Sequence, residues 1–267
     1  MPGSDGRFMA GGLAFHRLKF AEVTALVVIV AVAVRRPLAL ALAGLGFVSV
    51  LVFPAARASA GALVLALSLT VRPRWLSAAL IVGAIALVGL TPGLRERFLS
   101  STTSSGSGER AAILQSGLDA VAAHPLTGVG LGRFKPSLFA RADAPPELLD
   151  NAGKSHNQFL SLAAEGGVGH ALLFALLLGW VALRLLRARP SKARTAGLAA
   201  LAFFVLLCLV HDPMFHAVMV QGTALLLGGA VGLGVRQQEP DEREAQLRRA
   251  LQVQAAGDAG AQKPGGA

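Results

Sequence analysis

Seven apolar stretches limit the possible folds of this chain more than any other feature of its sequence. They are Phe20–Val34, Pro37–Phe53, Ala58–Val71, Trp75–Leu90, Leu160–Leu183, Thr195–Val210 and Ala217–Val235. A helix needs about 20 apolar residues to cross a bilayer, so bilayer thinning and snorkelling arginines have to accommodate the shorter stretches. The pattern predicts an all-α fold, a polytopic membrane bundle of about seven spans.

The composition agrees with a membrane protein. Of 267 residues, 54% are hydrophobic and 15% are charged, against about 25% charged in soluble domains. This excludes a soluble globular domain, a disordered chain and a fibre. The net charge of +10 comes largely from Lys and Arg between apolar stretches, so it indicates topology and not nucleic-acid binding. The single cysteine, Cys208, cannot form an intrachain disulfide.

The basic residues predict an orientation. They cluster at Arg35–Arg36, Arg72–Arg74, Arg184–Arg194 and Arg236, which are alternate ends of successive spans, and such clusters stay cytoplasmic. The predicted organisation is an external segment 1–19, four spans in 20–90, an external catalytic loop 91–158, three spans in 159–235 and a cytoplasmic polar tail 236–267. A polar external N-terminus without a secretory signal suggests either that spans are missing upstream or that the chain is naturally short.

The predicted external loop contains the most informative motifs. A Ser/Thr/Gly run, Ser100–Gly108, predicts a flexible stretch, and Glu109–Ala123 predicts an amphipathic helix that His124-Pro125 ends. Its apolar residues are expected on one face, and they are Ile113, Leu114, Leu118 and Val121. A glycine-rich turn follows at Pro125–Phe134. Beyond the loop, Asp241–Gln254 in the tail predicts a short helix.

Two arginines are candidates for anion binding. Arg57 lies at the outer end of a predicted span, where most single arginines are interfacial anchors. Arg110 lies at the start of the amphipathic helix, where the dipole favours anions over cations. A guanidinium group stays charged and offers phosphate a planar fork of donors. Each arginine is therefore either a phosphate ligand or a structural residue, in which case Arg110 pairs with Glu109 or Asp119.

His156 is the candidate for proton chemistry, because imidazole exchanges protons near neutral pH. Ser155 and Asn157 beside it predict a helix cap, and a histidine that merely flanks the cap is the alternative. Glu165, near the outer end of the same apolar stretch, requires a partner or solvent. The residue spacing puts Glu165 and His156 on opposite sides of one continuous helix.

Gly128, Gly130 and Gly132 alternate in the turn that also contains Arg133. No strand precedes this turn and the spacing is wrong for a dinucleotide-binding fingerprint. The turn is either simply flexible or needs glycine for a positive φ or for close approach of its backbone to a ligand.

Several catalytic signatures are absent from the sequence. It has no Asp-x-Asp pair outside the predicted spans, no Cys/His cluster at metal-ligand spacing, no Walker loop and no Gly-x-Ser-x-Gly elbow. These absences disfavour a metal-dependent nucleotide-sugar enzyme, an ATPase and a serine hydrolase. No metal site and no cofactor are expected.

Taken together, the blocks of the loop resemble the O-antigen ligase and O-antigen polymerase family of membrane glycosyltransferases. The matching segments are Arg110–Leu114, His124–Phe134, Ser155–Leu160 and Glu165–Gly169, with a short match at Arg57–Ser59. The resemblance covers roughly residues 57–235, with a looser similarity at 12–25. Two features depart from it. Family members usually have ten or more spans, and Leu114 and Gln115 stand where an aromatic residue is often found.

The resemblance implies transfer of a glycan from undecaprenyl diphosphate to an acceptor hydroxyl, at the periplasmic face of the bacterial inner membrane. The acceptor is the lipid A core in ligases, a lipid-linked repeat in polymerases and a protein side chain in related enzymes. Arg57 and Arg110 would bind the diphosphate, and His156 would orient or deprotonate the hydroxyl or contact phosphate. The substrate-binding residues would be Gly128, Gly130, Gly132, Arg133, Asn157 and Glu165. No metal or nucleotide is implied.

Two other classes stay open. A carrier or channel would place ionisable residues in mid-span, but the predicted spans are nearly free of charge and His170 is the main exception. A non-catalytic fragment or partner subunit is the other alternative, since the chain has fewer spans than the family.

Overall fold

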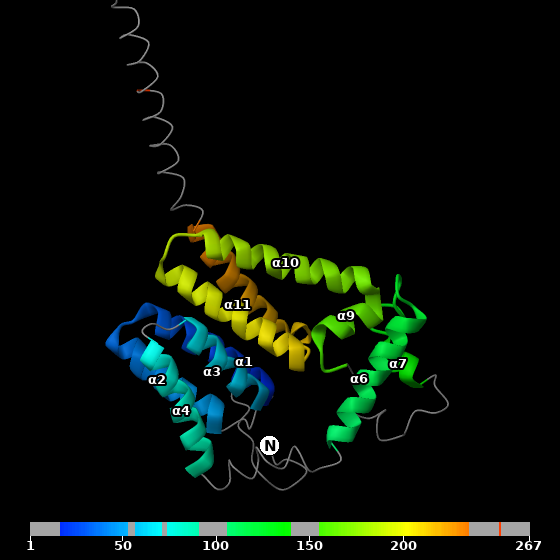
Figure 1. The fold of residues 1–267 in the computed structure, drawn as a ribbon, viewed down its shortest axis with the longest axis horizontal. Coiled ribbons are helices and arrows are strands. Elements are labelled where there is room, and N and C mark those ends of the chain that lie inside the picture. The colour runs from blue at the N-terminus through cyan, green and yellow to red at the C-terminus, as the bar shows by residue number, and fades with distance from the viewer. Residues whose placement is uncertain are drawn as a thin grey trace, which may run out of the picture.

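The chain folds into helices. The computed structural model describes residues 17–52, 57–70, 74–90, 106–139, 155–234 and 251, and every regular element in these ranges is a helix (Figure 1). The all-helical fold class is therefore confirmed for the described part of the chain. The predicted tail helix, Asp241–Gln254, lies outside the described residues except for Leu251, which is helical.

Four helices form the N-terminal half, and they are α1 (Arg17–Val34), α2 (Pro37–Val52), α3 (Arg57–Thr70) and α4 (Arg74–Leu90). Arg35 and Arg36 join α1 to α2, and Pro37 begins α2, where its missing N–H costs nothing. The two helices pack closely at Gly46, where an added Cβ would lie 2.8 Å from a methyl carbon of Val28. Small residues allow such close approach between membrane helices.

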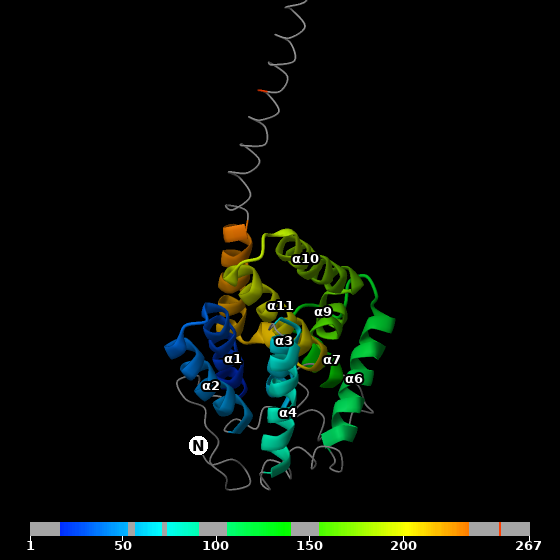
Figure 2. The same cartoon turned by 60° about the vertical axis from the view of Figure 1, so that its left-hand side comes forward.

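The second half consists of α6 (Gly106–Ala123), α7 (Phe134–Phe139), α9 (Gln158–Gly166), α10 (Val168–Arg187), α11 (Lys192–Val210), the 3₁₀ turn η2 (Pro213–Phe215) and a last helix, Ala217–Gly234. The long helix α11 is central, since it contacts α1, α3, α9 and α10 (Figures 1 and 2). Its side chains Phe203, Leu207 and Cys208 belong to the main apolar core.

The bundle has two chemically different ends. At one end, Lys192 Nζ donates a hydrogen bond to the Val34 carbonyl at 3.0 Å, next to Arg35 and Arg36. We call this the basic end. At the other end Glu22, near the start of α1, contacts His216, which follows η2. We call this the histidine end; it also contains His156 and His211. The two contacts make α1 and α11 antiparallel.

Three helices are long and apolar enough to cross a membrane by length and composition, and they are α10, α11 and Ala217–Gly234. Shorter apolar helices occur at Pro37–Val50, Ala58–Leu69 and Arg74–Ala86, within three of the other predicted spans. The remaining one, α1, has 18 residues and carries Arg17, Lys19 and Glu22 near its start. The count of seven spans stays a prediction.

The stretch Leu160–Leu183, predicted as one span, is divided between two helices. Gly167, with φ of 82°, is both the C-cap of α9 and the N-cap of α10, so the helix is interrupted there. An added Cβ at Gly167 would lie 2.1 Å from the Leu126 carbonyl oxygen. The break therefore comes from packing against the glycine-rich turn, which hydropathy alone does not reveal.

The predicted helix is present as α6, but its apolar residues are not gathered on one face, and the buried face differs from the predicted one. Ile113 and Gly117 are buried and Ala120 is partly buried, whereas Leu114 and Leu118 are 41% and 49% exposed. The grouping of the two leucines with Ile113 was wrong because the packed face is narrow and lined by small residues. The predicted flexible run lies outside the described residues up to 105, and its last three residues are helical.

Candidate functional site

The histidine selected from the sequence lies directly before α9. Asn157 is the N-cap of α9, and its side-chain oxygen accepts a hydrogen bond from the Leu160 N–H at 3.1 Å. This confirms the predicted cap. His156 has φ of 58°, in the left-handed region that is uncommon for residues other than glycine. Such a conformation persists only where the surroundings enforce it, and it is frequent at functional sites.

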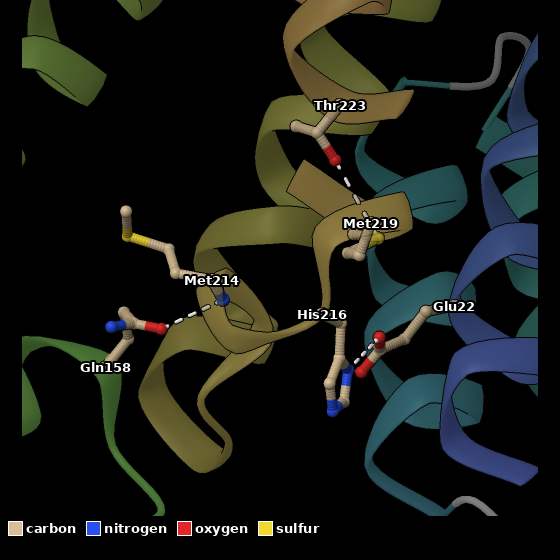
Figure 3. A network of polar contacts seen from close by, with 6 residues as sticks. All are labelled: Glu22, Gln158, Met214, His216, Met219 and Thr223. Atoms are coloured by element: carbon tan, nitrogen blue, oxygen red, sulfur yellow. Dashed lines mark hydrogen bonds and ion pairs between the residues drawn. The ribbon is translucent and has the colours of Figure 1, made fainter. Parts of the chain in front are cut away.

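Three imidazoles lie in series at the histidine end. The ring of His156 lies 6.0 Å from that of His211, and the ring of His211 lies 5.5 Å from that of His216, measured between centroids. The series ends on Glu22, whose Oε2 lies 2.6 Å from His216 Nδ1 (Figure 3). Glu22 is 0% exposed and its other oxygen, Oε1, has no hydrogen-bond partner within the described part of the chain. A buried carboxylate is costly without such a partner, so the pair with His216 stabilises it.

Several hydrogen bonds join the start of α9 to the segment after α11. Ser161 Oγ donates to Asp212 Oδ1 at 2.6 Å, and Asn157 Nδ2 donates to the Leu209 carbonyl at 3.2 Å. The Met214 N–H donates to Gln158 Oε1 at 3.0 Å (Figure 3). Ser161, Gln158 and Asp212 are all buried. These bonds fix the histidine end as one polar layer.

The glycine-rich turn packs against the other end of α9. The Val129 N–H donates to the Ala164 carbonyl at 2.8 Å, and the Gly130 N–H donates to the Glu165 carbonyl at 3.0 Å. Gly128, with φ of 64°, lies so close to Glu165 that an added Cβ would be 2.3 Å from its carbonyl carbon. The turn thus satisfies carbonyl groups that the end of a helix leaves open.

The three glycines therefore have different surroundings. All three have positive φ, which agrees with the interpretation that the turn needs glycine for its backbone conformation. The backbone of Gly128 approaches α9, whereas a Cβ at Gly130 would meet the side chain of Arg133 at 3.2 Å. A Cβ at Gly132 would have nothing within 4 Å. Arg133 is exposed, and its N–H donates to the Gly130 carbonyl at 3.0 Å.

The residues predicted for the site fall into two groups. His156 and Asn157 lie at the start of α9, and Gly128, Gly130 and Glu165 lie at its end. The two groups lie at opposite ends of α9, whose nine residues make it roughly 13 Å long. Glu165 is buried near the end of α9, whereas His156 lies before its start.

The two arginines are described only by their backbone. Arg57 is the first residue of α3, and Arg110 lies near the start of α6; the side chains of both are outside the described part of the structure. The helix that carries Arg110 does contact the start of α9, because an added Cβ at Gly117 would lie 2.8 Å from Leu160 and 3.4 Å from Ser155. Arg110 is two turns before that contact, roughly 10 Å along the helix axis.

Sequence reasoning missed four polar residues of the histidine end, and they are Glu22, His211, Asp212 and His216. Two signals were available. Glu22 is a lone acid in the first apolar helix, and a charge there needs a partner. The segment 211–216 places two histidines and an aspartate at the same predicted membrane face as His156. The sequence does not show which of these side chains contact one another.

An apolar groove of about 400 Å³ lies between α10, α11 and the last helix. Its lining includes Phe174, Leu177, Trp180, Phe204, Met214 and Leu227. Met214 is the residue whose N–H is bonded to Gln158. The groove therefore extends from the polar layer at the histidine end along the apolar part of the candidate spans.

The geometry and motifs define an integral membrane protein with one polar layer at the end of a helical bundle. Residues 13–175, more than half of the chain, match the family described as O-antigen ligase, and the chain belongs to this family. Membership places it among glycosyltransferase-like membrane proteins of surface-polysaccharide assembly, whose substrates are lipid-linked glycans and polysaccharides. A comparison with curated proteins finds no match.

Proposed function

We propose that this protein transfers a glycan from undecaprenyl diphosphate to a hydroxyl of the lipid A core, at the periplasmic face of the bacterial inner membrane. The observation that carries the proposal is the arrangement around α9. The segment Ser155–Asn157 precedes it, the turn that follows His124-Pro125 packs on its end, and the helix of Arg110 contacts its start. Segments distant in sequence thus pack around one short helix, and the proposed site lies along it.

The chemistry needs stabilisation of the departing diphosphate and removal of one proton. The acceptor oxygen forms a bond to the anomeric carbon while the bond from that carbon to the diphosphate oxygen breaks. Arg57 and Arg110 stabilise the charge that develops on the diphosphate. His156 accepts the proton of the acceptor hydroxyl, and His211 beside it supports the imidazole. The reaction needs neither metal nor nucleotide.

The polyprenyl tail occupies the groove between α10, α11 and the last helix. Its lining is almost wholly apolar, and one end adjoins the polar layer of the histidine end. A lipid diphosphate has the same division into an apolar chain and a charged head. Because the tail comes from the bilayer and not from water, the groove would contribute van der Waals packing and orientation of the lipid, and not hydrophobic transfer energy.

Reconstitution of the full chain in liposomes tests this function directly. The liposomes contain an undecaprenyl-diphosphate glycan and, in separate samples, a lipid A core, a second lipid-linked repeat or an acceptor protein. The expected product is glycosylated lipid A core. Product only on the repeat or on the protein would replace the ligase reaction with polymerisation or protein glycosylation, and no product on any acceptor would contradict the proposal.

Substitutions then test the assigned residues. Arg57→Ala, Arg110→Ala and His156→Ala are each expected to lower the transfer rate about 10²- to 10³-fold, because each removes a group that acts in the transition state. Arg189→Ala, at the basic end, is the matched control and should keep the wild-type rate. Wild-type rates in the three variants would contradict the assignment, provided that all four proteins insert in the membrane equally.

A further inference from the structure

Three side chains at the histidine end have the composition and the proximity of a metal site. His156, His211 and Asp212 each offer one ligand atom, and these atoms all lie within 4.8 Å of one another. They come from two segments, the start of α9 and the end of α11, which are far apart in sequence. Spacing rules for local clusters therefore do not find them.

The surrounding hydrogen bonds orient the carboxylate and hold the two segments together. Ser161 Oγ donates to Asp212 Oδ1, which orients the carboxylate from behind. The bonds from Asn157 to the Leu209 carbonyl and from Met214 to Gln158 fix the two segments against each other. Partners of this kind orient metal ligands and are needed for affinity. The cluster is thus a supported site and not a chance meeting of surface residues.

The charge of the layer also favours a cation. Asp212 is 4% exposed and Glu22 is 0% exposed, so two carboxylates are buried in one polar layer. His216 contacts Glu22 directly (Figure 3). Burial of a carboxylate requires compensation by positive charge or by a metal ion. A divalent ion bound by Asp212, His156 and His211 would lie next to this negative charge.

We propose that His156, His211 and Asp212 bind a divalent transition-metal ion of the zinc type. Two imidazoles and one carboxylate form a donor set that zinc accepts, with metal–ligand bonds of about 2.0–2.2 Å. Tetrahedral bonds of this length separate the ligand atoms by roughly 3.4 Å. The ligand atoms lie within 4.8 Å of one another, so metal binding requires the half-buried imidazoles to move closer to the carboxylate. Three protein ligands leave a fourth position for water.

The metal site does not depend on the proposed transfer reaction. It shares His156 with that reaction, so zinc and the glycan acceptor would compete for one imidazole. The site is in this sense inhibitory, and metal-independent transfer is compatible with it.

Metal binding by the purified full chain in detergent tests the proposal without any measurement of activity. The protein is first treated with a chelator and then titrated with Zn²⁺ in competition with a chromogenic zinc indicator. We expect one zinc ion per chain. Asp212→Asn, which keeps an acceptor for Ser161, and His211→Ala should each weaken binding at least tenfold. His124→Ala, at the exposed end of α6, is the matched control and should bind as the wild type does.

A spectroscopic measurement separates ligation from loss of the fold. Co²⁺ in place of Zn²⁺ should give the visible absorption of a tetrahedral site in the wild type and in His124→Ala. The absorption should be lost in Asp212→Asn while the unfolding temperature without metal stays within a few degrees of the wild-type value. The proposal is overturned if the wild type binds no zinc, or if Asp212→Asn binds both metals as the wild type does.

Discussion

Glu22 and His216 form a carboxylate–imidazole pair in which the carboxylate is fully buried. Breaking a buried pair by removing one partner is more destabilising than replacing both, because the remaining group stays buried without compensation. His216→Ala, which leaves the Glu22 carboxylate buried without its partner, is therefore expected to lower the free energy of unfolding by about 3 kcal/mol. The measurement is a denaturant titration in detergent micelles, followed by fluorescence of Trp75 and Trp180.

The double variant provides the check on this pair. Glu22→Ala combined with His216→Ala should cost less than the sum of the two single changes, with a coupling of about 1–3 kcal/mol. Glu22→Gln, which keeps a hydrogen-bond acceptor for the imidazole, should cost less than Glu22→Ala. Additive single changes would show that the pair contributes nothing as a pair.

For individual residues, the sequence predicts their position in the chain's helices better than it predicts which side chains they contact. His156 and the cap formed by Asn157 follow from a polar motif before an apolar stretch, and both are where the motif implies. Glu22 and Asp212 could not be assigned partners, because those partners come from distant segments and a contact between segments is a property of the packed fold. The same reason explains why the sequence does not bring His156, His211 and Asp212 together.

Among the contacts between helices and turns, the contact between the glycine-rich turn and α9 leaves the least room for an added side chain. Gly128→Ala places a Cβ 2.3 Å from the Glu165 carbonyl carbon, so the turn has to separate from α9. Gly132→Ala, also at positive φ, meets no atom within 4 Å and is the matched control. Strain at positive φ alone costs about 1 kcal/mol, so the difference between the two variants measures the contact.

We expect Gly128→Ala to lower the unfolding temperature in detergent by several degrees more than Gly132→Ala does. Hydrogen exchange of the Val129 and Gly130 amides should increase in Gly128→Ala, since their bonds to the Ala164 and Glu165 carbonyls are lost. Equal exchange in both variants would mean that the turn tolerates the added Cβ by a shift of its backbone.

The elements themselves were largely predictable, and the break between α9 and α10 was not. Hydropathy alone located the apolar helices, and His124-Pro125 correctly ends α6 at Ala123. The break at Gly167 depends on a backbone contact with Leu126, which no periodicity in 160–183 reveals. Leu114 and Leu118 were misplaced for a related reason, since the face of α6 that packs on α9 is decided by Gly117.

The groove between α10, α11 and the last helix gives a prediction for the proposed transfer. Ala224 lines the groove, and Ala224→Trp would fill space that the polyprenyl tail needs. The transfer rate at low donor concentration should fall at least tenfold, with recovery at high donor concentration. Leu225→Trp, at the next position and 78% exposed outside the groove lining, should stay within twofold of the wild type. Equal effects of the two substitutions would exclude the groove as the tail site.

In the molecule as a whole, the different composition of the two ends of the bundle predicts which end faces the periplasm. Lys192 and Arg35 lie at the basic end, and the imidazoles and buried carboxylates lie at the histidine end. Cytoplasmic retention of basic segments predicts that the histidine end faces the periplasm, where lipid-linked glycans would reach it. Each end is assembled from segments of both halves of the chain, so the orientation of one helix determines that of its neighbours.

Thiol labelling in intact cells tests this orientation. The native Cys208 is fully buried, so the wild-type chain should not react with a membrane-impermeant maleimide and serves as the background. Leu131→Cys, in the exposed turn beside α9, should be labelled from outside once the outer membrane is opened. Pro190→Cys, in the exposed connection between α10 and α11, should be labelled only after the inner membrane is also permeabilised. The reverse order would place the imidazoles in the cytoplasm and contradict periplasmic glycan transfer.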